Sequence, residues 1–425
     1  MKKLFPFIII LLLAGCTKTQ PLPVEPAEPQ PIPPVVLAQE EESDGEKVFD
    51  LQPEPEEPEA SKETMAEVEP PSEKELLVEE LLQKMSLEEK VGQMFFVRCP
   101  AAGATEKIET YHLGGYLLFT RDFKDAAGQW LTEEAFVEKI IGYQDTASIP
   151  LLIGVDEEGG TVARASRNPN LFPEKFKSPQ ELFAENGLER IALDATDKHR
   201  DLLRLGINVN FAPVADVSTD PADFIYDRAF GQDAQATAEY VETVVTAAGA
   251  VSVSGGDVPY RIGCVLKHFP GYGNNADTHS GIAIDQRPYQ QFVEEDFLPF
   301  QAGIDAGAGS VLVSHNVVTS MDENFPASLS PEVHRILREE LGFEGVILTD
   351  DLAMDAVEAY AKDGSVAVLA VLAGNDMIVT TDFEKQIPLV VDAVGSGLIQ
   401  EEIIDNAVRR VLGWKIDLGL IGDAA

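Results

Sequence analysis

The feature that most constrains the fold of this chain is a repeated order of short apolar runs, each followed by a stretch with helical spacing of its apolar residues. Such runs are typical of strands in a parallel sheet, because helices cover both faces of the sheet. Eight runs are expected to be strands: residues 93–97, 115–119, 151–155, 207–211, 262–267, 310–314, 345–348 and 376–379. Eight strand–helix units predict a single closed (β/α)8 TIM-type barrel. The alternative is a doubly wound open sheet, but no glycine-rich dinucleotide fingerprint follows the first run.

The barrel region is expected to begin at residue 75 and to run to residue 425 as one domain, since no internal repeat or second domain is visible. Residues 76–90 have the apolar spacing of a helix, and Ser86-Leu87-Glu88-Glu89 within them resembles a capping box.

The first fifteen residues have the organisation of an export signal. Met1-Lys2-Lys3 is a short positive start, residues 4–13 are apolar, and Leu13-Ala14-Gly15-Cys16 is a small-residue cleavage site. The apolar run is too short to span a bilayer comfortably. The cleavage site resembles the lipobox of bacterial lipoproteins, which implies lipidation of Cys16 and a protein exported and anchored to the cell envelope. An ordinary secretory signal is the alternative.

Residues 16–74 are expected to form a disordered tether behind the lipidated cysteine. Between residues 17 and 74 lie twelve of the 27 prolines and sixteen acidic residues, against four lysines. Such a segment has too few apolar side chains to form a core, and proline keeps it extended.

The charge and the cysteines exclude other classes of protein. A net charge of −41 makes nucleic acid an improbable partner, because the phosphate backbone would be repelled. No CxxC pattern indicates a zinc site, and Cys99 and Cys264 lie in or next to expected core strands. A disulfide between these two remains open. We expect no metal, no cofactor and a monomer.

Polar residues gather where the expected strands end, and these ends meet at one mouth of a barrel. A mixture of carboxylates and cations there suits a polyhydroxylated substrate. The residues in question are Asp156-Glu157-Glu158 with Arg164, Asp216 with Asp227-Arg228, Lys267-His268, Ser314-His315-Asn316 and Thr349-Asp350-Asp351.

Two groups have the chemistry of catalytic residues. Asp277 precedes His279 by two residues in a loop rich in Gly and Asn, where its carboxylate can hold the imidazole and raise its basicity. Asp350 is expected near Lys267 or Arg228, whose charge would keep it ionised as a nucleophile. The spacing alone does not choose between Asp350 and Asp351.

Several motifs in order resemble glycoside hydrolase family 3, in its β-N-acetylglucosaminidase branch. They are Asp156-Glu157-Glu158-Gly159-Gly160, Lys267-His268-Phe269-Pro270-Gly271, Asp277-Thr278-His279 and Thr349-Asp350-Asp351-Leu352, and the resemblance runs from about Leu77 to the C-terminus. It identifies residues 75–425 as the catalytic domain. The family's usual loop has a second histidine where this chain has Tyr272, and Ser where it has Thr278.

The resemblance implies a retaining mechanism with a covalent glycosyl-enzyme. Asp350 would be the nucleophile, His279 the acid/base, and Asp277 the group that orients His279. The implied sugar-binding residues are Asp156, Arg164, Arg228, Lys267 and His268. The expected reaction is removal of terminal β-linked N-acetylglucosamine from peptidoglycan or muropeptides.

Four alternatives stay open: a β-glucosidase or a phosphorylase on the same scaffold, a non-catalytic lipoprotein that binds wall sugars, and a metallohydrolase. The metallohydrolase would use ligands among His268, Asp277, His279, His315 and Asp350.

Overall fold

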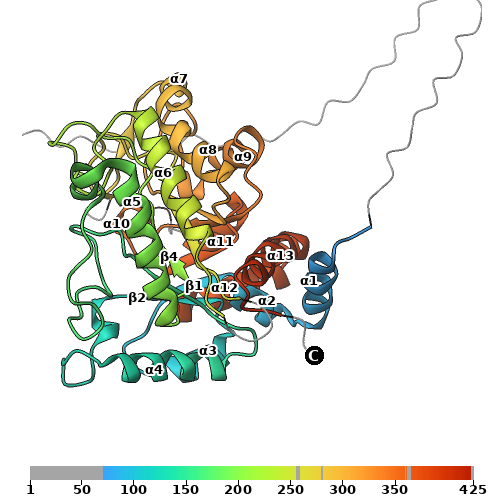
Figure 1. Ribbon diagram of the computed structural model, residues 1–425. Helices are drawn as coiled ribbons and strands as arrows, with labels where there is room; N and C mark the ends of the chain where they lie inside the picture. The colour runs from blue at the N-terminus through green and yellow to red at the C-terminus, as the bar shows by residue number, and fades with distance from the viewer. Residues whose placement is uncertain (1–69, 255–258, 279–280, 359, 361–364, 423–425) are drawn as a thin grey trace, which may run out of the picture. The chain divides into compact units, whose positions relative to one another are not determined.

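A computed structural model describes residues 70–254, 259–278, 281–358, 360 and 365–422 (Figure 1). Residues 68–425 form one compact unit. The expected signal peptide 1–15, Cys16 and most of the expected tether 16–74 lie outside the described residues, so they stay predictions. None of the described helices is both long enough and apolar enough to cross a membrane.

Eight parallel strands form a barrel, which confirms the predicted fold class. In spatial order the sheet runs β10-β1-β2-β3-β4-β5-β7-β9, and a parallel bridge between Leu348 and Met377 joins its two edges. The strands are β1 (Phe95–Arg98), β2 (Gly115–Leu118), β3 (Leu152–Val155), β4 (Val209–Asn210), β5 (Gly263–Phe269), β7 (Ser310–Val313), β9 (Val346–Thr349) and β10 (Ile378–Thr380). Each of the eight predicted runs overlaps one of these strands, with ends that differ by up to two residues, and β4 is only two residues long.

Helices separate successive strands in the chain and two more follow β10, and most of them cover the outside of the barrel. They are α3 (Ala104–Tyr111), α4 (Glu133–Thr146), α5 (Pro179–Arg204), α6 (Ala234–Gly249), α7 (Tyr289–Gln291), α8 (Phe297–Asp305), α9 (Pro331–Arg335), α10 (Asp355–Glu358), α11 (Val366–Ala373), α12 (Phe383–Gly395) and α13 (Glu401–Asp417). Helices α5, α6 and α8 lie side by side (Figure 1). A small parallel pair, β6 (Ile284–Asp285) and β8 (Val317–Val318), is added outside the barrel.

The predicted helix over residues 76–90 is two helices, α1 (Glu73–Lys84) and α2 (Leu87–Gln93). Ser86 is the N-cap of α2 and forms a capping box with Glu89. Ser72 and Glu75 form a second capping box at the start of α1. A capping box marks the beginning of a helix, so the motif inside the predicted segment indicated a break.

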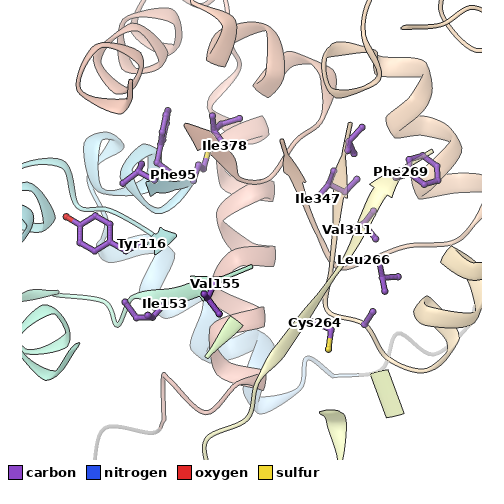
Figure 2. Packing of buried hydrophobic residues seen from close by; sticks show 14 of the residues in the cluster. Phe95, Tyr116, Ile153, Val155, Cys264, Leu266, Phe269, Val311, Ile347 and Ile378 are labelled. Atoms are coloured by element: carbon purple, nitrogen blue, oxygen red, sulfur yellow. The ribbon is translucent and has the colours of Figure 1, made fainter. Parts of the chain in front are cut away.

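The strands alternate between two cores, because successive side chains of a strand point to opposite faces. Phe95, Ile153 and Leu266 belong to the large cluster between strands and helices, part of which Figure 2 shows. Their neighbours Phe96, Leu152 and Val265 belong to the cluster inside the barrel. Cys99 and Cys264 are buried free thiols, so no disulfide joins them.

Helix α13 closes the end of the barrel where the strands begin. Its Trp414 belongs to the inner cluster, and it lies so close to the strand starts that a Cβ added at Gly263 or Gly309 would approach the indole to 2.6 or 2.4 Å. The opposite end, where the strands finish, carries the polar residues.

Helix α13 also buries a lysine at this closed end. Lys415 is 0% exposed, and its Nζ donates to Oε1 of Gln93 at 2.6 Å. Burial lowers the pKa of Lys415 from 10.5 to about 7, because a charged ammonium is poorly solvated there.

Replacing Lys415 with Met is expected to remove the contribution of this lysine to the pH dependence of the free energy of unfolding. Because the folded-state pKa is about 7 and the unfolded one 10.5, the unfolded chain binds more protons between these pH values. The free energy of unfolding of the unmodified protein should therefore rise with pH through that window, by up to about 1.4 kcal/mol per pH unit. Urea denaturation should show the advantage of Lys415→Met shrinking as the pH rises; a constant difference would contradict the assignment.

Candidate active site

Polar residues predicted at the strand ends lie at the mouth of the barrel. Asp156 follows β3, Asp216 lies beyond β4, and Asp350 follows β9. Lys267 and His268 are among the last three residues of β5. Because all eight strands are parallel, these ends lie on one rim.

A buried ion-pair cluster of Asp156, Glu158, Arg228 and Lys267 joins the ends of β3 and β5 to the loop between β4 and α6. Nζ of Lys267 lies 2.8 Å from Oδ1 of Asp156 and 2.6 Å from Oε1 of Glu158. Glu158 also accepts from Nε and Nη2 of Arg228, at 3.0 and 2.8 Å. Lys267 and Arg228 therefore share the carboxylate of Glu158. At the mouth, Lys267 has Asp156 as a further partner and Arg228 has His268.

The two cations keep Glu158 ionised. Burial alone would raise the pKa of Glu158, but the charges of Arg228 and Lys267 together outweigh it and hold the pKa well below its usual range. A buried charge is stable only when it is paired and hydrogen-bonded, and Glu158 meets both conditions. The cluster thus fixes Lys267 and Arg228 before any substrate binds.

His268 is held from both ring nitrogens. Its Nδ1 lies 2.7 Å from Oδ2 of Asp216, and Nη2 of Arg228 lies 3.1 Å from its Nε2. A guanidinium only donates, so Nε2 must be the acceptor and the proton is on Nδ1, which donates to Asp216. The hydrogen bonds thus define one tautomer of a neutral ring.

Arg164 is placed through the backbone of its own turn. Oε2 of the buried Glu157 accepts from the amides of Arg164 and Ala165, at 2.9 and 2.7 Å, and Oε1 of Glu157 accepts from the hydroxyl of Ser166. The guanidinium of Arg164 lies 5.6 Å from the centre of the Phe119 ring. Its Nε is buried without a hydrogen-bond partner among the described residues, so it can donate to a bound ligand.

The two adjacent aspartates differ in their hydrogen-bond partners. Asp351 accepts from the amide of Ala353 at 3.0 Å and from the hydroxyl of Thr381 at 3.1 Å, so its carboxylate is tied to the surrounding loops. Asp350 is half-buried, its amide donates to the carbonyl of Val313, and its Oδ1 accepts from the amide of Asp351 at 2.8 Å. The two carboxylates are therefore held by different parts of the chain.

The loop after β5 returns to the neighbourhood of Asp350. Burial raises the pKa of the Tyr272 phenol, and the charges of Asp350 and Asp277 raise it further. Tyr272 therefore lies within electrostatic reach of both carboxylates. Asp277 is half-buried and Thr278 is buried. His279, the predicted acid/base, lies outside the described residues.

Two of the five residues considered as metal ligands, His268 and His315, are engaged with protein groups. His268 contacts Asp216 and Arg228, while Nδ1 of His315 lies 2.7 Å from the hydroxyl of Ser328 and Nε2 lies 3.1 Å from the carbonyl of Asp351. Within the part of the chain that the structure describes, no three His, Cys, Asp or Glu residues are grouped so as to hold a metal ion.

Three residues of the site were not assigned a role from the sequence: Glu158, Asp216 and Tyr272. The first two stood among the polar residues at strand ends, which was a usable signal. Glu158 pairs with Lys267, 109 residues away, and Asp216 pairs with His268, 52 residues away. Spacing in the sequence does not reveal such pairs.

Comparison with known proteins gives consistent results. The family described as "Glycosyl hydrolase family 3 N terminal domain" matches residues 86–413. A β-hexosaminidase from Nitrosomonas eutropha is 32% identical over 281 residues, covering 64% of this chain and 76% of that protein. The β-hexosaminidase LpqI from Mycobacterium tuberculosis is 32% identical over 349 residues, covering 78% of this chain and 83% of that protein.

Solved structures resemble the fold as well. A glycoside hydrolase family 3 β-N-acetylglucosaminidase from Paenibacillus sp. superimposes with a TM-score of 0.69 at 28% identity, and the match covers 80% of this chain and 64% of that one. A β-N-acetylhexosaminidase from Beutenbergia cavernae superimposes with a TM-score of 0.66 at 29% identity, covering 78% of this chain and 99% of that one.

Replacing Asp216 with Asn should weaken sugar binding, because an amide oxygen holds the His268 tautomer less strongly than a carboxylate does. We expect KM for an aryl N-acetylglucosaminide to rise about tenfold, with about 1–3 kcal/mol lost in stability. Asp376→Asn is the matched control, since Asp376 is equally buried at 1% exposure but pairs with Arg338 and Arg410 next to the start of β10. It should lose stability with KM unchanged. Equal KM values in all three proteins would contradict the role given to Asp216.

Proposed function

The chain belongs to glycosyl hydrolase family 3 and is a glycoside hydrolase, and we propose that it is a retaining exo-β-N-acetylglucosaminidase. Its substrate would be terminal β-linked N-acetylglucosamine of peptidoglycan or muropeptides. The observation that carries this proposal is the position of Asp350 on the same rim as Lys267, Arg228 and His268. The names of the similar proteins support N-acetylglucosamine as the sugar.

The cluster would bind the sugar hydroxyls. Asp156 and Glu158 offer carboxylate acceptors, while Lys267, Arg228 and Arg164 offer charged donors. Hydrogen bonds with a charged partner are about twice as strong as neutral ones. Because Asp156, Glu158, Lys267 and Arg228 are already paired with one another, little of their side-chain freedom is lost when the sugar binds.

Bond cleavage would proceed in two steps. A carboxylate oxygen of Asp350 attacks the anomeric carbon while His279, oriented by Asp277, gives its proton to the leaving oxygen. The resulting glycosyl ester of Asp350 is then attacked by water, from which neutral His279 takes a proton. The sugar leaves with its original β configuration, and both residues return to their starting states.

The proposed location is the cell envelope. The sequence features of residues 1–16 support export and lipidation at Cys16, and the acidic, proline-rich segment that follows would let the catalytic domain extend away from the lipid surface. A domain held there would meet peptidoglycan outside the cytoplasm.

A panel of aryl β-glycosides tests the reaction. We expect hydrolysis of the N-acetylglucosaminide at least about tenfold faster than of the glucoside or xyloside, since the acetamido group is part of the proposed substrate. Asp350→Asn should lower kcat by at least about 10³-fold, because the amide is a poor nucleophile. Asp351→Asn is the matched control and should retain far more activity.

The same assay separates the alternatives. Cleavage of the glucoside or xyloside alone would overturn the substrate, and a rate that depends on phosphate with release of a sugar phosphate would indicate a phosphorylase. Loss of activity on exhaustive chelation would point to a metallohydrolase. A protein that binds muropeptides but cleaves none would be a wall-sugar-binding lipoprotein.

A further inference from the structure

The loop that follows β5 is packed tightly at its beginning. Gly271 has φ +124°, and a Cβ there would lie 2.1 Å from Oδ1 of Asp296. The carbonyl of Gly271 accepts from Nη2 of Arg287 at 3.0 Å, and that guanidinium is held by the buried carboxylates of Asp285 and Asp296. The start of the loop is therefore fixed to the body of the domain.

Tyr272, the next residue, points into the protein. Its side chain is 2% exposed and packs with Val214 and Ile225. The ring centres of His268 and Phe224 lie 5.7 and 5.6 Å away. Its amide donates to Oδ1 of Asp216 at 2.7 Å, so the carboxylate that orients His268 also holds Tyr272.

The phenol oxygen of Tyr272 closes the loop on itself. It accepts from the amide of Thr278 at 2.9 Å. Its own proton can go to the Thr278 hydroxyl at 3.1 Å or to the Ala276 carbonyl at 3.2 Å. Thr278 is only 1% exposed, so its amide would have no water to replace this acceptor. Leaving a buried donor unpaired costs about 1–3 kcal/mol.

Thr278 is the residue between Asp277 and His279, the two groups of the proposed proton-transfer pair. We propose that Tyr272 is a positioning residue, whose hydroxyl holds the backbone at Thr278 and so fixes the position of Asp277, the group proposed to orient His279. This inference rests on the proposed function, because it assumes that these residues transfer the proton. The family's usual loop has His at this position, so the device belongs to this chain's own sequence.

Tyr272→Phe tests the proposal with two aryl N-acetylglucosaminides. Departure of 2,4-dinitrophenolate needs no proton, whereas departure of unsubstituted phenol does. A misplaced proton donor slows only the departure of phenol. We therefore expect kcat/KM for the phenyl substrate to fall about 10- to 100-fold. The value for the dinitrophenyl substrate should change less than about threefold, and His279→Ala should show the same pattern with a larger loss.

Tyr116→Phe is the control for losing a buried phenol. Tyr116 is 0% exposed and its hydroxyl donates to the carbonyl of Ala104 at 2.7 Å, on the outer side of β2. This variant should lose stability without changing the ratio of the two substrates. Equal losses on both substrates in Tyr272→Phe, or no loss on either, would overturn the positioning role.

The proposed function can fail separately. Asp350→Asn should abolish cleavage of both substrates, and full activity in that variant would overturn the nucleophile whatever Tyr272→Phe shows. If Asp350→Asn is inactive while Tyr272→Phe keeps the normal substrate ratio, only the inference about Tyr272 fails.

Discussion

Lys267 and Arg228 share the buried carboxylate of Glu158, and the arrangement of the barrel mouth follows from this contact. The carboxylate follows β3, Lys267 belongs to β5, and Arg228 lies between β4 and α6. Removing any one charge would leave its partners buried and incompletely paired, which typically costs 3–5 kcal/mol. The cluster therefore sets the relative positions of the ends of β3 and β5 and of the loop between β4 and α6, as well as the donors available to a sugar.

From this cluster the contacts continue to the catalytic loop. Arg228 contacts His268, His268 contacts Asp216, and Asp216 accepts from the amide of Tyr272. Tyr272 in turn holds Thr278. One connected set of hydrogen bonds thus links the proposed sugar-binding residues to the residue between Asp277 and His279. The proposed sugar binding and the proposed proton transfer would therefore depend on the same buried hydrogen bonds.

The barrel could be predicted from the sequence because all eight strands are covered on both faces and read as apolar runs. The mouth residues could be predicted because strand ends carry polar side chains that a core does not need. The prediction of one helix over residues 76–90 was wrong. The capping box at Ser86 starts a new helix, whereas the prediction placed it inside a single helix.

Pairing across the barrel had no local signal. The contact between Lys267 and Asp156 joins residues 111 apart, and only the closed sheet brings them together. The resemblance pointed to Asp350 rather than Asp351, but the contacts of Asp351 with Ala353 and Thr381 could not be predicted from the sequence. Tyr272 was visible as a departure from the family's loop, but the partner of its hydroxyl was not.

The covalent bond to Asp350 is the central claim, and trapping it is the most direct test. The protein would be incubated with 5-fluoro-N-acetylglucosaminyl fluoride, whose ring fluorine slows breakdown of the glycosyl-enzyme, then digested and analysed by mass spectrometry. We predict one added 5-fluoro-N-acetylglucosaminyl group, located by fragmentation on Asp350. A label on Asp351, or no label on a protein that still cleaves aryl N-acetylglucosaminides and releases the inverted sugar, would contradict the account.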